Sequence, residues 1–172
     1  AIGPSIPLVL QGGKHVQSWA PSTLPEVDVD YMDRIMKMYE KDSLLSSALM
    51  EAQGMSDVSG GDGKKGPRQF IDMMRAAAEF MVKPDGARLA SIDIGGWDTH
   101  ANQGTETGRL AQVLGVLAEG IAAYREAMAP VWKDTAVLVI TEFGRTVHDN
   151  GTGGTDHGTG TVAFLLGGVW LA

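Results

Sequence analysis

Apolar residues recur at helical spacing in four stretches of the chain. The first stretch begins after Asp28 and Asp30, either of which can cap a helix. Its apolar positions are Tyr31, Ile35, Met38 and Tyr39. The other three helical runs cover about residues 42–54, 68–84 and 106–128. Spacings of three and four residues place these side chains on one face, so we expect helices that each bury that face.

Three other stretches are almost continuously apolar and predict buried strands. They are residues 88–94, 135–141 and 161–168, and two shorter strands are expected within residues 5–19. The long helix between the first two would connect them as a β-α-β unit, which pairs its strands in parallel. Strands without polar alternation are typical of a sheet covered on both faces. The predicted fold class is therefore α/β, with a mostly parallel sheet and helices on both faces.

The length and the ends of the chain suggest how it is organised. With 172 residues and 44% hydrophobic content, the chain is one domain long and can build a core. It starts at Ala1 without an initiator Met and ends in an apolar segment. We therefore expect residues 1–172 to form a single α/β domain that is a piece of a larger one. Residues 54–67 are rich in glycine and charge, and predict a flexible loop.

The composition excludes several classes of function. A net charge of -7 argues against nucleic-acid binding, which depends on neutralising phosphates with Lys and Arg. The sequence has no run of 18 apolar residues, so we expect no membrane span. The chain has no Cys, which excludes disulfides and thiolate metal ligands.

Two polar segments that follow predicted strands contain the candidate chemistry. "GGWDTH" follows the first strand, and "EFGRTVHDNGTGGTDHG" follows the second. Sites in parallel sheets lie beyond the carboxyl ends of the strands, so the two segments can converge on one cleft. The candidate metal ligands are Asp98, His100, Asp156 and His157. Carboxylates and imidazoles without thiolates suit Zn, Mn or Fe.

Each of these polar residues also has a simpler structural explanation. Asp98 can cap a turn, and an Asp-His dipeptide is common by chance. Glu142 is either a ligand or a salt-bridge partner of Arg145, whose guanidinium can also hold a phosphate or sulfate oxygen. Thr99 and Thr155 are candidate nucleophiles, but threonine beside glycine more often bonds the backbone. Only the joint occurrence of these residues at two strand ends favours metal binding.

The motifs "GGWDTH", "EFGRT" and "GTDHG", in this order and with a long helix between the first two, resemble the bacterial family labelled domain of unknown function 1501. That family is grouped with the alkaline-phosphatase-like superfamily of metal-dependent phosphatases, sulfatases and phosphomutases. The resemblance implies that Asp98 and His100 hold one metal ion, and that Asp156 and His157 hold a second. It also implies an upstream Asp and a nucleophilic Ser or Thr, which no segment here matches. It further implies a twin-arginine signal and a periplasmic or exported location.

The leading hypothesis is an exported, metal-dependent hydrolase of phosphate or sulfate esters, inactive in this chain because its nucleophile segment is missing. Its cofactor would be one or two divalent transition-metal ions, Zn or Mn, and its substrate a small-molecule or glycan ester. Glu142 and Arg145 are candidate catalytic residues, and Arg145 would steady the oxygens of the ester. The alternative is a non-catalytic exported binding or surface-associated protein with a partial or structural metal site. The remainder of its own chain or a second copy is an expected partner.

Overall fold

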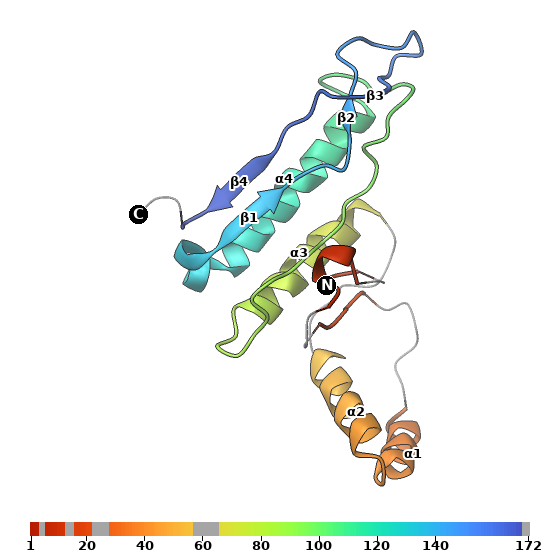
Figure 1. Cartoon of the computed structure of the whole chain (residues 1–172), viewed down its shortest axis with the longest axis vertical. Coiled ribbons are helices and arrows are strands. Elements are labelled where there is room, and N and C mark those ends of the chain that lie inside the picture. Colours follow the sequence, from red (N-terminus) through yellow and green to blue (C-terminus); the bar gives the residue numbers. More distant parts are fainter. Residues whose placement is uncertain (4–5, 13–15, 22–27, 57–65, 170–172) are drawn as a thin grey trace.

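The computed structural model describes residues 1–3, 6–12, 16–21, 28–56 and 66–169 and is mostly helical (Figure 1). The α-helices are α1 (Val29–Tyr39), α2 (Ser43–Ser56), α3 (Pro67–Met81) and α4 (Arg109–Ala127), which confirms the four predicted helices. The 3-10 helices are η1 (Leu8–Leu10) and η2 (Ala129–Asp134). The strands are β1 (Ala136–Val139), β2 (Gly144–Arg145), β3 (His157–Gly158) and β4 (Phe164–Gly167). Among the described residues, every helix is too short or too polar to cross a bilayer.

Aspartate side chains cap the first two helices. Oδ1 of Asp28 accepts a hydrogen bond from the backbone N–H of Asp30 at 3.1 Å. Oδ1 of Asp42 accepts from the N–H groups of Leu44 and Leu45 at 3.0 and 3.1 Å. These bonds satisfy first-turn donors that have no partner within the helix. The capped helices α1 and α2 contact each other and lie at one end of the molecule (Figure 1).

The core lies between α3 and α4. The alanines at 76–78 on α3 have 0% exposed surface. Gly120 of α4 faces Phe70 so closely that a Cβ atom there would lie 2.4 Å from Cε1 of the ring. Nearer the end of α4, the buried Tyr124 donates its hydroxyl to Sδ of Met81 at 3.4 Å, and burial raises the pKa of this tyrosine. Small residues and one aromatic ring thus allow the two helices to pack closely.

The predicted parallel sheet is wrong. β1 and β4 pair antiparallel, with Ala136 opposite Gly167, and β2 and β3 form a second antiparallel pair. The chain returns from β1 to β4 through residues 140–163 without a crossover helix, so the two strands run in opposite directions. Parallel pairing among the described residues is confined to isolated bridges of Ile2 with Trp19 and with Ile92.

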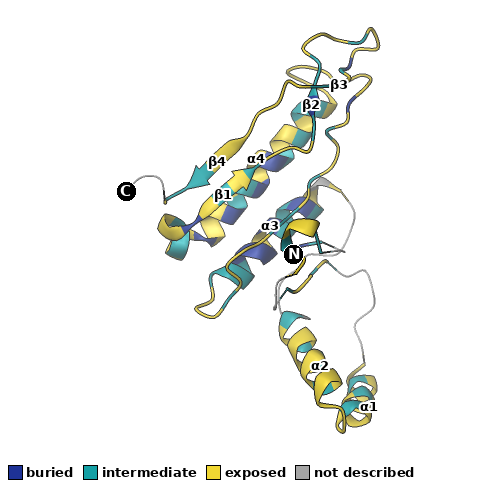
Figure 2. Ribbon diagram, viewed as in Figure 1, coloured by how far each residue is buried: buried dark blue, intermediate teal, exposed yellow. Residues whose placement is uncertain are grey.

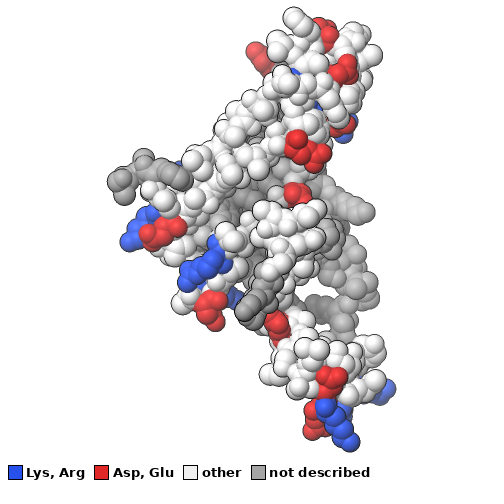
Figure 3. Space-filling view, in the orientation of Figure 1, with Lys and Arg blue, Asp and Glu red and all other residues white. Residues whose placement is uncertain are grey.

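The prediction of helices on both faces of the sheet is also wrong. Val137 and Val139 of β1 pack against the core, but Leu138 between them is 60% exposed. On β4, Phe164 and Leu165 are also exposed, and the helices lie on one side only (Figure 2). The outer surface of this pair is uncharged (Figure 3). An apolar run has the same appearance in a strand covered on one face and in a strand covered on two. The burial predicted for these strands from their sequence is therefore too high.

The remaining predicted strands are reduced to single pairings. Within residues 5–19, the described part forms η1 and pairs only at Trp19. Residues 88–94 form no ladder. Their pairing is an isolated bridge at Ile92, where the N–H of Ile2 donates to the carbonyl of Ser91 at 2.9 Å and ties this segment to the N-terminus. Of the predicted loop at 54–67, the first residues continue α2 to Ser56, α3 begins at the last, and residues 57–65 lie outside the described part.

Candidate metal centre

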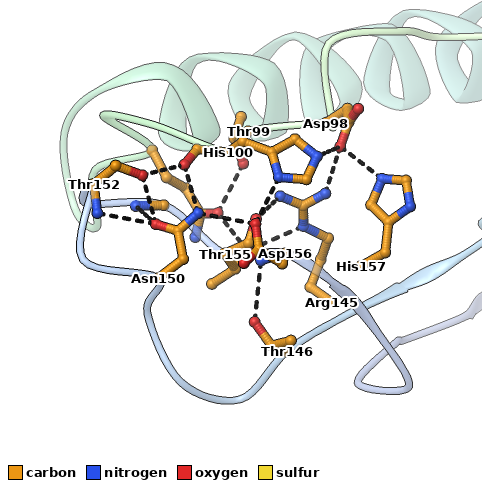
Figure 4. A network of polar contacts seen from close by, with 12 residues as sticks. Asp98, Thr99, His100, Arg145, Thr146, Asn150, Thr152, Thr155, Asp156 and His157 are labelled. Atoms are coloured by element: carbon orange, nitrogen blue, oxygen red, sulfur yellow. Dashed lines mark hydrogen bonds and ion pairs between the residues drawn. The ribbon is translucent and has the colours of Figure 1, made fainter.

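Two chain segments meet at the end of the molecule opposite α1 and α2 (Figures 1 and 4). One is the "GGWDTH" segment, which precedes α4, and the other is the β2–β3 hairpin with its long loop. The hairpin register places Arg145 opposite His157. The backbone N–H of Thr155 donates to the carbonyl of Thr99 at 3.2 Å, which joins the two segments directly. The convergence predicted from the two motifs therefore occurs, although on a different scaffold.

Three of the predicted ligands converge on one point. Nε2 of His100 lies 2.8 Å from Oδ1 of Asp98, and Nε2 of His157 lies 3.0 Å from the same oxygen. The ligand atoms of these three residues all lie within 4.8 Å of one another. Their side chains are 54%, 47% and 57% exposed for Asp98, His100 and His157, so solvent reaches the group freely. This geometry suits a single ion that is held from one side.

Arg145 is the main cationic partner of Asp98. Its Nη1 donates to Oδ1 of Asp98 at 2.6 Å, Nε donates to Oγ1 of Thr155 at 3.0 Å, and Nη2 donates to the carbonyl of Thr155. The hydrogen bond from Arg145, followed by that from His157, lowers the pKa of Asp98. The guanidinium therefore connects the two segments and keeps the carboxyl group ionised. To contact a substrate oxygen through Nη1, Arg145 would have to release Asp98.

Asp156 lies on the opposite side of the His100 ring. Its Oδ1 is 2.8 Å from Nδ1 of His100, while Nε2 of that ring faces Asp98. Hydrogen bonds from Asn150 and then from His100 lower the pKa of Asp156 (Figure 4). A carboxylate at one imidazole nitrogen fixes the orientation of the ring and directs the other nitrogen towards a metal. Asp156 thus contacts His100, whereas its neighbour His157 contacts Asp98.

The ring of His157 is also fixed by an aromatic contact. Phe143 stacks on it with ring centroids 4.3 Å apart and an interplanar angle of 24°. The guanidinium carbon of Arg145 lies 5.8 Å from the centroid of the Phe143 ring. Phe143 carries no sequence signal for this role, because an aromatic residue after a strand has no ligand chemistry of its own.

The glycines of the second segment allow backbones to approach closely. A Cβ atom at Gly154 would lie 2.3 Å from the carbonyl carbon of His100. A Cβ atom at Gly158 would lie 2.7 Å from the backbone nitrogen of Thr146. Both distances are too short for any side chain, so glycine is required by contact with neighbouring backbone. The glycine-rich composition of "GGTDHGTG" therefore reflects the packing of this loop against its neighbours.

Neither candidate threonine nucleophile is free to attack a substrate. Thr99 is 2% exposed and donates its hydroxyl to Oε1 of Gln103 at 2.7 Å. Thr155 donates to the same oxygen at 2.8 Å and accepts from Arg145. Gln103 was not selected from the sequence, because a bond that spans 52 residues leaves no local pattern. Both hydroxyls instead hold the segments together.

Glu142 lies apart from this network. Its side chain is exposed, and no hydrogen bond or ion pair connects it to Arg145 or to another described residue. The cation of Arg145 is bound by Asp98 instead. His148 is exposed in the β2–β3 loop. The structure thus brings together Asp98, His100, Arg145, Asp156 and His157, and leaves Glu142 outside.

The fold and the site describe a mostly helical protein with an exposed cluster of Asp and His side chains. By sequence, the chain belongs to the family described as protein of unknown function (DUF1501), whose model matches residues 30–169. The matched range includes every candidate ligand. Comparison with curated proteins and comparison with solved structures gave no match.

Proposed function

We propose that this chain binds one divalent transition-metal ion through Asp98, His100 and His157. The observation that carries the proposal is the approach of two imidazole Nε2 atoms to one carboxylate oxygen, at 2.8 and 3.0 Å. One oxygen and two nitrogen donors without thiolate suit Zn or Mn. Three ligands leave at least one coordination position for water or a substrate, as catalytic sites require. The exposure of the group supports such an open position.

We propose further that the ion serves the hydrolysis of phosphate or sulfate esters. Resemblance of the motifs around Asp98 and Asp156 to the alkaline-phosphatase-like superfamily supports this reaction class and export to the periplasm. A bound cation polarises a phosphoryl or sulfuryl oxygen and stabilises the charge that develops on it. Thr99 and Thr155 are both occupied by Gln103, so no nucleophile is assigned to either. We therefore expect these 172 residues to bind the metal and an oxyanion without turning over an ester.

Metal and anion titrations test the two parts separately. Zn²⁺ and Mn²⁺ are titrated into wild-type protein and into His157→Ala, with His148→Ala from the same loop as the matched control. We expect one ion per chain for wild type and the control, and none at comparable affinity for His157→Ala. The proposed metal site is contradicted if His157→Ala binds the ion as wild type does, or if His148→Ala loses binding as well.

The anion titration addresses the reaction class. Inorganic phosphate and sulfate are added to the metal-loaded and the metal-free wild type and followed by calorimetry. We expect binding of at least one anion only when the metal is present. If the metal-loaded protein binds neither anion, the proposed hydrolysis is contradicted, whereas the proposed metal site is not.

A structural ion is the second candidate function. Asp98 and His157 are 59 residues apart in sequence, so an ion held by both would cross-link two segments that are otherwise joined by hydrogen bonds. Binding that requires the folded state stabilises it by an amount that grows with the logarithm of the metal concentration. Under this alternative, chelation lowers the melting temperature, and the metal-loaded protein binds no anion.

A further inference from the structure

Asn150 occupies a central position between the two segments of the metal centre. It lies in the β2–β3 loop, six residues before Asp156, and its side chain is drawn in Figure 4. Its Nδ2 donates to the carbonyl of His100 at 2.8 Å and to Oδ1 of Asp156 at 3.0 Å. These two acceptors belong to different segments, so one amide group connects them.

The oxygen of the same amide binds the loop itself. Oδ1 of Asn150 accepts from the backbone N–H of Thr152 at 3.1 Å and from that of Gly154 at 3.3 Å. Backbone N–H groups can only donate and the carbonyl of His100 can only accept, so the two ends of the amide are distinguished by their partners. The side chain therefore has one orientation that satisfies all of these bonds.

The contacts of Asn150 lead to the metal-facing atom of His100. Oδ1 of Asp156 receives Nδ2 of Asn150 and also lies 2.8 Å from Nδ1 of His100. Asn150 thus holds the backbone of His100 and the carboxylate that orients its ring. With Nδ1 held at Asp156, Nε2 of the same ring faces Oδ1 of Asp98.

We propose that Asn150 is a positioning residue of the metal centre, which fixes the orientation of His100 through Asp156. This inference rests on the proposed metal site. Asn150 touches neither the ion nor a substrate, and it acts only by holding the ligand. Removing such a supporting group lowers metal affinity about 10- to 100-fold in comparable sites.

The test compares two substitutions that remove different parts of the amide. Asn150→Ala removes both ends. Asn150→Asp keeps an oxygen for the N–H groups of Thr152 and Gly154, but loses the donor to His100 and Asp156. Co²⁺ is titrated as a spectroscopic substitute for Zn²⁺, and its visible spectrum reports the ligand field. His148→Ala is the control, because this histidine lies in the same loop and no described residue bonds its side chain.

We expect both Asn150 variants to bind Co²⁺ about 10- to 100-fold more weakly than wild type and with a changed visible spectrum. His148→Ala should bind Co²⁺ with the affinity and the visible spectrum of wild type.

Three outcomes overturn the inference. In the first, Asn150→Asp binds Co²⁺ with wild-type affinity and spectrum, so that Asn150 only supports the loop. In the second, Asn150→Ala binds Co²⁺ with wild-type affinity and spectrum. In the third, wild type binds no Co²⁺, which overturns the proposed metal site as well, whereas the first two leave that site standing.

Discussion

The close contact between α3 and α4 makes a prediction that two glycines of the same helix can test. Gly115 and Gly120 both lie inside α4, and both should gain helical stability when replaced by alanine. A Cβ atom at Gly115 would have nothing within 4 Å. A Cβ atom at Gly120 would lie 2.4 and 2.8 Å from two ring carbons of Phe70 and 3.3 Å from Cγ of Met74. The two substitutions therefore share one local effect and differ in packing.

The magnitudes follow from these distances. Ordinary contact begins at 3.4 Å, so the Phe70 ring would have to retreat by about 1 Å in a close-packed interior. Phe70 is only 8% exposed, which leaves little room for that movement. Overpacking of this kind costs about 1–3 kcal/mol. The gain in helix propensity from Gly to Ala is about 0.8–1 kcal/mol at either site.

We expect Gly115→Ala to raise the free energy of unfolding by up to about 1 kcal/mol. The free energy of unfolding of Gly120→Ala should be about 1–3 kcal/mol lower than that of Gly115→Ala. Each kcal/mol corresponds to about 2–4 °C in melting temperature for a chain of this size. Urea and thermal unfolding, followed by circular dichroism at 222 nm, measure both variants. Equal increases for the two variants would refute the packing of Gly120 against Phe70.

Three further predictions test the sheet and the site. In urea unfolding, Val137→Ala should lower the free energy of unfolding by about 1 kcal/mol more than Leu138→Ala does, because of these two residues only Val137 packs against the core. A larger loss for Leu138→Ala would mean that the outer face of the strand pair is covered. Gly154→Ala should abolish or greatly weaken Zn²⁺ binding in calorimetry, because its Cβ atom would overlap the backbone of the facing segment; unchanged affinity would contradict the close approach. Arg145→Met should raise the pKa of Asp98 towards its ordinary value of 3.8, which can be measured by NMR titration in chelator. Because the folded-state pKa of Asp98 is lowered, the stabilisation from this pair is present above about pH 4 and is lost as the pH falls through the folded-state pKa. The part of the difference in melting temperature between wild type and Arg145→Met that depends on pH should therefore be present at pH 7 and disappear in acid.

The sequence by itself determined the helices and the residues that gather at the site. Asp28 and Asp42 cap helices through bonds that reach two or three residues, and apolar spacing of three and four residues repeats within one helix. Such interactions are local, so a linear pattern contains them. The order of the motifs around Asp98, His100 and His157 likewise identified the candidate ligands before their contacts were known.

Tertiary structure alone decided the direction of the strands and the partner of each polar side chain. An apolar run such as residues 135–141 has the same appearance whether its neighbour is parallel or antiparallel, and whether one face or both are covered. Arg145 binds Asp98, 47 residues away, and not Glu142, three residues away. Asn150 bonds the carbonyl of His100, 50 residues away, as well as the nearby Asp156. Hydrogen bonds of this range depend on how loops meet in space, and no periodicity along the chain records that meeting.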